Sequence, residues 1–87
     1  MKIKKGFVVR EVGGENIAVP VGETAREFRG MVKLNSTALF LWNFFKSDKT
    51  FDEAVSALTE EYDVSREDAE EGVRSFIKIA GENGFFE

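Results

Sequence analysis

Acidic side chains are the most abundant groups in this sequence that could act in catalysis or bind a metal ion. They occur as adjacent pairs: Asp52-Glu53, Glu60-Glu61, Glu67-Asp68 and Glu70-Glu71. Acid–base catalysis or cation binding requires two or more such groups to converge in one pocket. Each pair lies instead in a segment with helical periodicity, where acids are common on the solvated face and in the first turn. The pattern therefore favours exposed helix faces over an acidic active site.

The 87 residues include neither cysteine nor histidine. This composition excludes disulfides, thiolate metal sites and nucleophiles activated by histidine. The glycine-rich segments Gly13-Gly14 and 81–84 lack the strand-to-helix context and the lysine of a phosphate-binding loop. We therefore expect no cofactor and no metal, and a protein that is not an enzyme.

Length and charge point to one small domain over residues 1–87. The formal net charge of −4 is poorly suited to neutralising phosphates, so we expect no nucleic-acid partner. No apolar run approaches the roughly 20 residues that span a bilayer, and the apolar stretch after the basic N-terminal residues is too short for a signal peptide. We expect a cytoplasmic protein without a membrane partner.

The first third of the chain has the pattern of strands. Residues 7–12 and the alternating Ile17, Val19 and Val21 flank a glycine turn, which predicts a β-hairpin. Residues 22–25 are expected to form a loop. A third strand is predicted from about Phe28 to Leu34, with alternate side chains on opposite faces.

Three helices are predicted after the strands, each with a start signal. Asn35, Thr50 and Ser65 are the expected N-cap residues, and Glu53 completes a capping box with Thr50. Gly84 is expected to end the last helix. The helix over residues 36–45 is apolar almost all round, which indicates central burial or a face that binds a partner. The predicted fold is α+β and winged-helix-like, with a three-stranded antiparallel sheet followed by three helices.

An outer strand of such a sheet has unpaired backbone groups, so an extended peptide can add to it as a further strand. The third strand is the candidate, with Arg29, Met31 and Lys33 on its more polar face. The equally weighted alternative is an ordinary edge strand whose charges prevent aggregation.

The run from Gly30 to Ala38, followed by Leu41-Trp42, resembles the PqqD family. The step Tyr62-Asp63-Val64 and the ending Gly84-Phe85 are also similar to members of that family, so the resemblance spans nearly the whole chain. It implies a winged-helix-like domain that recognises the leader segment of a ribosomally made precursor peptide. It further implies that the leader adds as a strand beside the third strand, next to the third helix, and is presented to a modifying enzyme, often a radical SAM enzyme.

The resemblance also implies which residues bind the peptide. On the strand we expect Arg29, Met31, Val32, Lys33 and Leu34. On the third helix we expect Glu70, Val73, Arg74 and Ile77. The opposite flank of that helix, with Gly72, Phe76 and Ile79, is the alternative that the sequence leaves open.

Two other functions fit the predicted topology. A winged-helix DNA-binding domain shares it, although the acidic start of the third helix would repel phosphates. A homodimerising structural module would use the apolar first helix as its interface.

Overall fold

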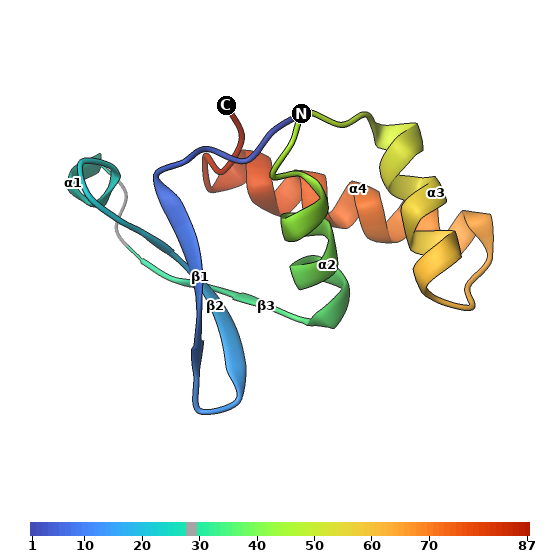
Figure 1. Cartoon of the computed structure of the whole chain (residues 1–87), viewed down its shortest axis with the longest axis horizontal. Coiled ribbons are helices and arrows are strands. Elements are labelled where there is room, and N and C mark those ends of the chain that lie inside the picture. Colours follow the sequence, from blue (N-terminus) through green and yellow to red (C-terminus); the bar gives the residue numbers. More distant parts are fainter. Residues whose placement is uncertain (28–29) are drawn as a thin grey trace.

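The computed structural model describes residues 1–27 and 30–87, which form a three-stranded antiparallel sheet covered on one side by helices (Figure 1). Along the chain the elements are β1 (Phe7–Val12), β2 (Glu15–Pro20), α1 (Thr24–Glu27), β3 (Val32–Leu34), α2 (Ser36–Phe44), α3 (Phe51–Glu61) and α4 (Arg66–Glu82). The strands lie in the order β1-β2-β3, so β1 and β3 are the outer strands. The predicted sheet followed by three helices is confirmed.

The β1–β2 hairpin closes through a two-residue glycine turn. Val12 pairs with Glu15, and the φ angles of the intervening Gly13 and Gly14 are 59° and 82°. Two consecutive positive φ angles give the turn that matches the twist of a tight hairpin. The hairpin extends beyond the helices as a wing (Figure 1).

The third strand is shorter than predicted. β3 covers only Val32–Leu34, where Ala18, Ile17 and Asn16 of β2 are its partners. Gly30 has a φ of 122°, which departs from the strand conformation that the alternating side-chain pattern implied. The expected loop over residues 22–25 instead leads into α1, a single helical turn that the sequence pattern did not predict. The predicted strand residues Phe28 and Arg29 lie outside the described residues.

The starts of the three longer helices are capped as predicted. Asn35 Oδ1 accepts from the Ala38 N–H at 2.8 Å, and Ser65 Oγ accepts from the Asp68 N–H at 3.1 Å. The Thr50 capping box is complete, because the Glu53 carboxylate also accepts from the Thr50 N–H at 2.9 Å. These bonds satisfy backbone donors that helix starts otherwise leave unpaired.

The end of α4 is a Schellman motif. Gly84 adopts a φ of 68°, and the Phe85 N–H donates to the Ala80 carbonyl at 2.8 Å. The chain then reverses, and Phe85 becomes buried against the rings of Phe7 and Trp42, with centroid distances of 4.9 and 5.0 Å.

α2 supplies the centre of the core. Leu41, Trp42 and Phe45 at its end are fully buried, together with Val55 of α3 and Val73 of α4. The ring of Phe45 stacks on that of Phe76 at 5.9 Å, which joins α2 to α4. Full burial of each such side chain contributes roughly 1.5–3 kcal/mol. The apolar character of α2 therefore reflects its place between the sheet and the two longer helices.

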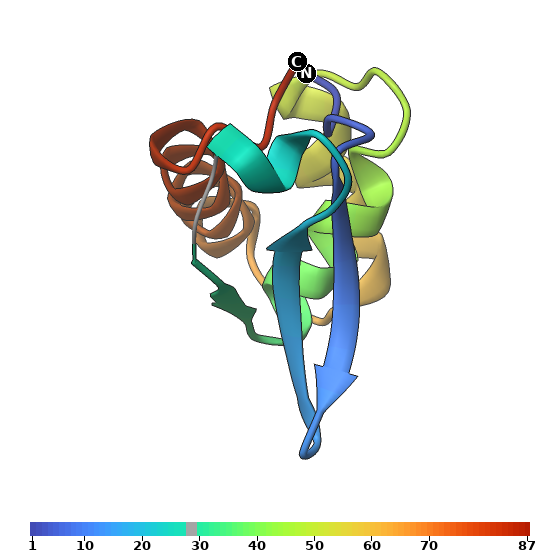
Figure 2. The ribbon, with the colours of Figure 1, turned by 90° about the vertical axis from the view of Figure 1, so that its left-hand side faces the viewer.

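The two ends of the chain lie side by side (Figures 1 and 2). Ile3 and Phe86 form an antiparallel bridge, flanked by a 2.8 Å hydrogen bond from the Lys4 N–H to the Phe85 carbonyl. Among the described residues, no helix is long and apolar enough to cross a membrane.

Candidate functional site

The carboxylate pairs lie on exposed helix faces. Arg66 contacts two of them, with Nη2 3.8 Å from Asp52 Oδ1 and Nε 3.5 Å from Glu70 Oε2. The described ranges contain no group of three or more acidic, histidine or cysteine side chains placed to hold a metal ion. The carboxylate of Glu53 has a structural role, because accepting the Thr50 backbone N–H holds its pKa below its usual range. Asp52, Glu53 and Glu60 line one open surface pocket together with Phe44, Ser56 and Ala57, but within the described ranges they do not form a group that could hold a metal ion.

The outer edge of β3 is open. Its other edge pairs with β2, and within the part of the chain that the structure describes no backbone group pairs with the outer edge. Figure 2 shows β3 (dark green) on the side of the sheet that is nearer to α4, with β1 on the far side. A strand added here would therefore lie between β3 and α4.

The strand residues expected at this edge divide between two faces. Leu34 is buried and Val32 half-buried against the core, whereas Met31 is 71% exposed. Lys33 is exposed, and its Nζ lies 2.9 Å from Glu15 Oε1 of the neighbouring strand. Arg29 lies outside the described residues.

Two cavities follow the space between β3 and α4. One of about 280 Å³ connects the start of β3 to the end of α4, and its lining includes Phe7, Ala18, Met31, Val32, Glu82, Asn83 and Phe85. The other, of about 300 Å³, connects the junction of β3 and α2 to the middle of α4, and its lining includes Asn35, Thr37, Leu41, Gly72, Ser75, Phe76 and Ile79. We call the two cavities together the β3–α4 groove.

One wall of the groove is the flank of α4 with Gly72, Phe76 and Ile79, which the sequence left open as the alternative. Gly72, Ser75 and Ile79 line it, and Ile79 is 42% exposed. A Cβ atom on Gly72 would lie 3.7 Å from Leu58 Cδ1 and 3.9 Å from Thr37 Cγ2, so this glycine faces the side chains of α2 and α3.

The helix residues that the sequence favoured lie elsewhere. Glu70 pairs with Arg66, Arg74 is exposed, and Ile77 packs half-buried against the core. None of these three lines either cavity of the groove, and Val73 is fully buried beneath it. The expectation that Glu70, Val73, Arg74 and Ile77 bind the peptide stays a prediction, and the cavity linings favour the flank with Gly72 and Ile79 instead. Helical periodicity identifies the buried stripe of α4, but it does not indicate which side of that stripe turns toward β3.

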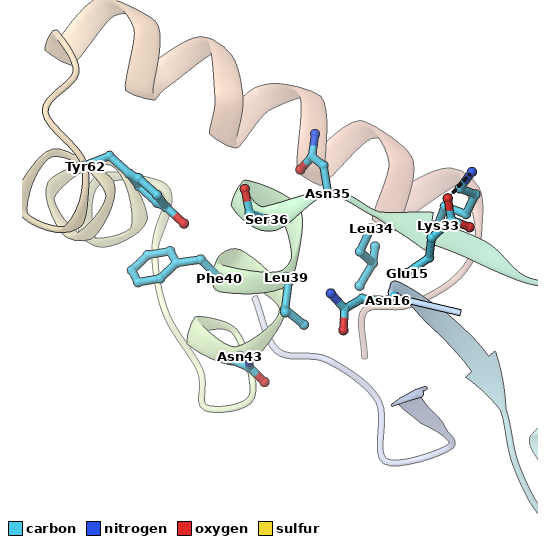
Figure 3. Close-up of a pocket in the computed structure, with 11 residues that line it drawn as sticks. Glu15, Asn16, Lys33, Leu34, Asn35, Ser36, Leu39, Phe40, Asn43 and Tyr62 are labelled. Carbon is cyan, nitrogen blue, oxygen red and sulfur yellow. Dashed lines mark ion pairs between the residues drawn. The ribbon is translucent and has the colours of Figure 1, made fainter. Parts of the chain in front are cut away.

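A larger pocket, of about 800 Å³, lies on the other side of the junction between β3 and α2 (Figure 3). It is bounded by the hairpin tip, α2 and the residue that follows α3; its lining comprises Gly14, Glu15, Asn16, Lys33, Leu34, Asn35, Ser36, Leu39, Phe40, Asn43 and Tyr62. We call it the hairpin–α2 pocket. Sequence reasoning missed it because its walls come from four separate segments. The signal in the sequence is that α2 is apolar almost all round, more than its buried Leu41 and Trp42 account for, so that Leu39 and Phe40 remain only half-buried.

Comparison with solved structures shows which fold the chain shares. Two solved structures share the fold. The first is described as TbiB1 in complex with the TbiA(beta) leader peptide, with a TM-score of 0.75, 22% identity, and coverage of 100% of this chain and 95% of that one. The second is lasso peptide synthetase B1 complexed with the leader peptide, with a TM-score of 0.73, 21% identity, and coverage of 97% and 93%.

Sequence comparison gives a complementary result. No curated protein matches the chain. The family model described as coenzyme PQQ synthesis protein D matches residues 19–85, which include β3 and all three longer helices. The chain belongs to the PqqD family.

Proposed function

We propose that this domain binds the leader segment of a ribosomally synthesised precursor peptide by strand addition to the outer edge of β3. The observation that carries the proposal is the open edge of β3 facing α4 across the β3–α4 groove. Membership of the PqqD family supports it, as do two structures of the same fold whose descriptions name a bound leader peptide.

Backbone pairing and side-chain contacts would have different roles in this complex. Each added backbone hydrogen bond contributes only about 0.5–1.5 kcal/mol, and β3 offers three residues. The edge therefore aligns the peptide, while apolar contacts with Met31, Val32 and Ile79 provide most of the affinity.

The groove also has an electrostatic preference. Glu82 lines it, and among the described residues no cation pairs with this carboxylate. The last turn of α4 contains no basic residue, so the negative end of the helix dipole is not compensated there. A leader with a basic side chain opposite Glu82 would bind better than one with an acidic side chain.

The domain would act by binding alone, without catalysis. In the proposed role it presents the bound leader to a modifying enzyme, for which a radical SAM enzyme is the candidate, in the cytoplasm where the precursor is made. The alternative of DNA binding has no support from charge, because Glu67 and Asp68 occupy the first turn of α4. Homodimer formation stays a prediction that sedimentation over a range of concentrations would test.

The proposal is tested by sequencing the genes that flank this one and titrating the ¹⁵N-labelled domain with a synthetic leader of any short precursor found there. Chemical shifts of β3 and of Gly72, Ser75 and Ile79 should change. Ile79→Ala should raise Kd about tenfold, corresponding to the loss of roughly 1.4 kcal/mol of apolar contact.

Arg74→Ala is the matched control, because Arg74 is exposed on the opposite flank of α4. It should leave Kd unchanged. Shift changes confined to the hairpin tip and the loops, with β3 and α4 unaffected, would refute the proposal.

A further inference from the structure

The hairpin–α2 pocket has the polar groups of a site for an uncharged chain. Asn16, Ser36, Asn43 and Tyr62 line it, and the side chains of these four make no hydrogen bond with the described part of the protein. Figure 3 shows Asn16 and Asn43 on opposite walls with Leu39 between them. An asparagine amide both donates and accepts, as does a peptide group, so two such amides can bond both polar atoms of a polypeptide backbone.

The charged groups at the rim neutralise one another. Lys33 and Glu15 form an ion pair at 2.9 Å, drawn as a dashed line in Figure 3. These two opposite charges leave no net charge at this part of the rim. The pocket therefore favours uncharged polar and apolar groups.

One wall of the pocket is aromatic and well supported. The ring of Phe40 meets that of Tyr62 edge-on at 5.8 Å and an interplanar angle of 78°. On its other side Phe40 stacks against Phe44 at 6.4 Å. These contacts hold Phe40 half-buried in place, where its exposed part can accept an apolar side chain.

The pocket adjoins the β3–α4 groove at Asn35. Asn35 lines both, and in Figure 3 its side chain points toward α4 and away from Leu39. A peptide paired with β3 that continues past Leu34 therefore reaches the pocket by crossing the exposed residues Asn35 and Ser36. Because such a segment is tethered, its effective concentration is on the order of millimolar, and weak contacts suffice to hold it.

We propose that the hairpin–α2 pocket binds the segment of the precursor peptide that flanks the strand-forming stretch on the Leu34 side. The inference rests on the proposed function, because the β3–α4 groove must first hold the leader. It assigns the precursor a second contact, made through backbone amides and an apolar side chain.

The test compares two peptides by calorimetry: the full precursor, and a minimal peptide limited to the stretch whose binding perturbs β3. The full precursor should bind the wild-type domain about tenfold more tightly, since the second contact is intramolecular once the first is made. Asn43→Arg, which places a long charged side chain in the pocket, should abolish this gain without changing the Kd of the minimal peptide.

Two further variants make the result specific. Ser47→Arg adds the same charge at an exposed position just beyond α2 that lines none of the cavities described, and it should retain the full gain. Asn16→Ala removes the amide from the opposite wall and should reduce the gain. Thermal unfolding of each variant confirms that the fold is intact.

The outcomes separate the two proposals. If the minimal peptide binds and the full precursor binds no better, or its gain survives Asn43→Arg, the pocket does not hold the precursor. If Asn43→Arg alters only self-association or the binding of a modifying enzyme, the occupant is that protein and the inference is wrong. If neither peptide binds, the proposed function fails, and this inference fails with it.

Discussion

Oδ1 of Asn35 accepts a hydrogen bond from the backbone N–H of Ala38 at 2.8 Å. This bond caps the start of α2, directly after the end of β3. Asn35 also lines both the β3–α4 groove and the hairpin–α2 pocket. The N-cap residue of α2 therefore forms part of the wall of both candidate binding surfaces.

Replacement of Asn35 by alanine removes the acceptor at the start of α2. The free energy of unfolding should fall by about 1 kcal/mol, the usual effect of losing an N-cap. Urea denaturation measures the change. Asn35→Asp keeps the hydrogen-bond acceptor, so its free energy of unfolding should be close to that of the wild type. If both variants lost the same free energy of unfolding, loss of the cap would not be the cause.

Two glycines near the end of α4 should respond to alanine in opposite directions. Gly84 has a φ of 68°, so Gly84→Ala should destabilise the fold by roughly 1–2 kcal/mol. Gly81 lies within the helix, and a Cβ there would meet no atom within 4 Å, so Gly81→Ala should stabilise by about 0.5–1 kcal/mol. Thermal denaturation of the two variants measures these changes. If the melting temperature shifted in the same direction for both variants, the role of Gly84 would be contradicted.

Gly72→Ala should separate stability from binding. The new Cβ would make ordinary contacts at 3.7 Å to Leu58 and 3.9 Å to Thr37, so the helix should gain about 1 kcal/mol. The methyl group also narrows the β3–α4 groove, so the affinity for the leader should fall. Gly81→Ala is the matched control, because Gly81 lines neither cavity of the groove. Calorimetric Kd values that are unchanged for Gly72→Ala would place the peptide elsewhere.

Acid should weaken the start of α3 through Glu53. The backbone N–H of Thr50 holds the pKa of this carboxyl below its usual range. Because the pKa of Glu53 is lower in the folded state than in the unfolded state, its carboxylate stabilises the fold fully above about pH 4.3, the usual glutamate pKa. This stabilisation is lost as the pH falls through the pKa of Glu53 in the folded state.

Glu53→Gln can still accept the Thr50 N–H but does not titrate. The denaturant midpoint of this variant should depend less steeply on pH between about 5 and 3 than that of the wild type. Glu60→Gln changes an exposed acid of the same helix that makes no hydrogen bond or ion pair with the described residues, and it should keep the wild-type slope. An unchanged slope for Glu53→Gln would exclude the capping carboxylate as the titrating group.

Local sequence signals predicted the helix starts and the hairpin turn, because each depends on residues close together in the chain. Asn35, Thr50 and Ser65 cap the helices where expected, and Gly13-Gly14 forms the turn. The family resemblance is confirmed over residues 19–85.

The errors concern relations between distant segments. The strand pattern before Val32 did not reveal the single turn of α1 or the positive φ of Gly30. The stripe of buried residues on α4 defined its core face, and the flank with Glu70, Arg74 and Ile77 was favoured because it combines an apolar residue with polar residues, whereas the cavities beside β3 are lined by the other flank. The hairpin–α2 pocket requires the packing of four segments, which no window of sequence contains.

The bridge between Ile3 and Phe86 brings the first and last residues together, away from the hairpin tip (Figure 1). A host protein could therefore carry this domain as an insertion in one of its surface loops, with entry and exit at neighbouring points. Joining residues 1 and 87 by a short linker would give the corresponding circular permutant.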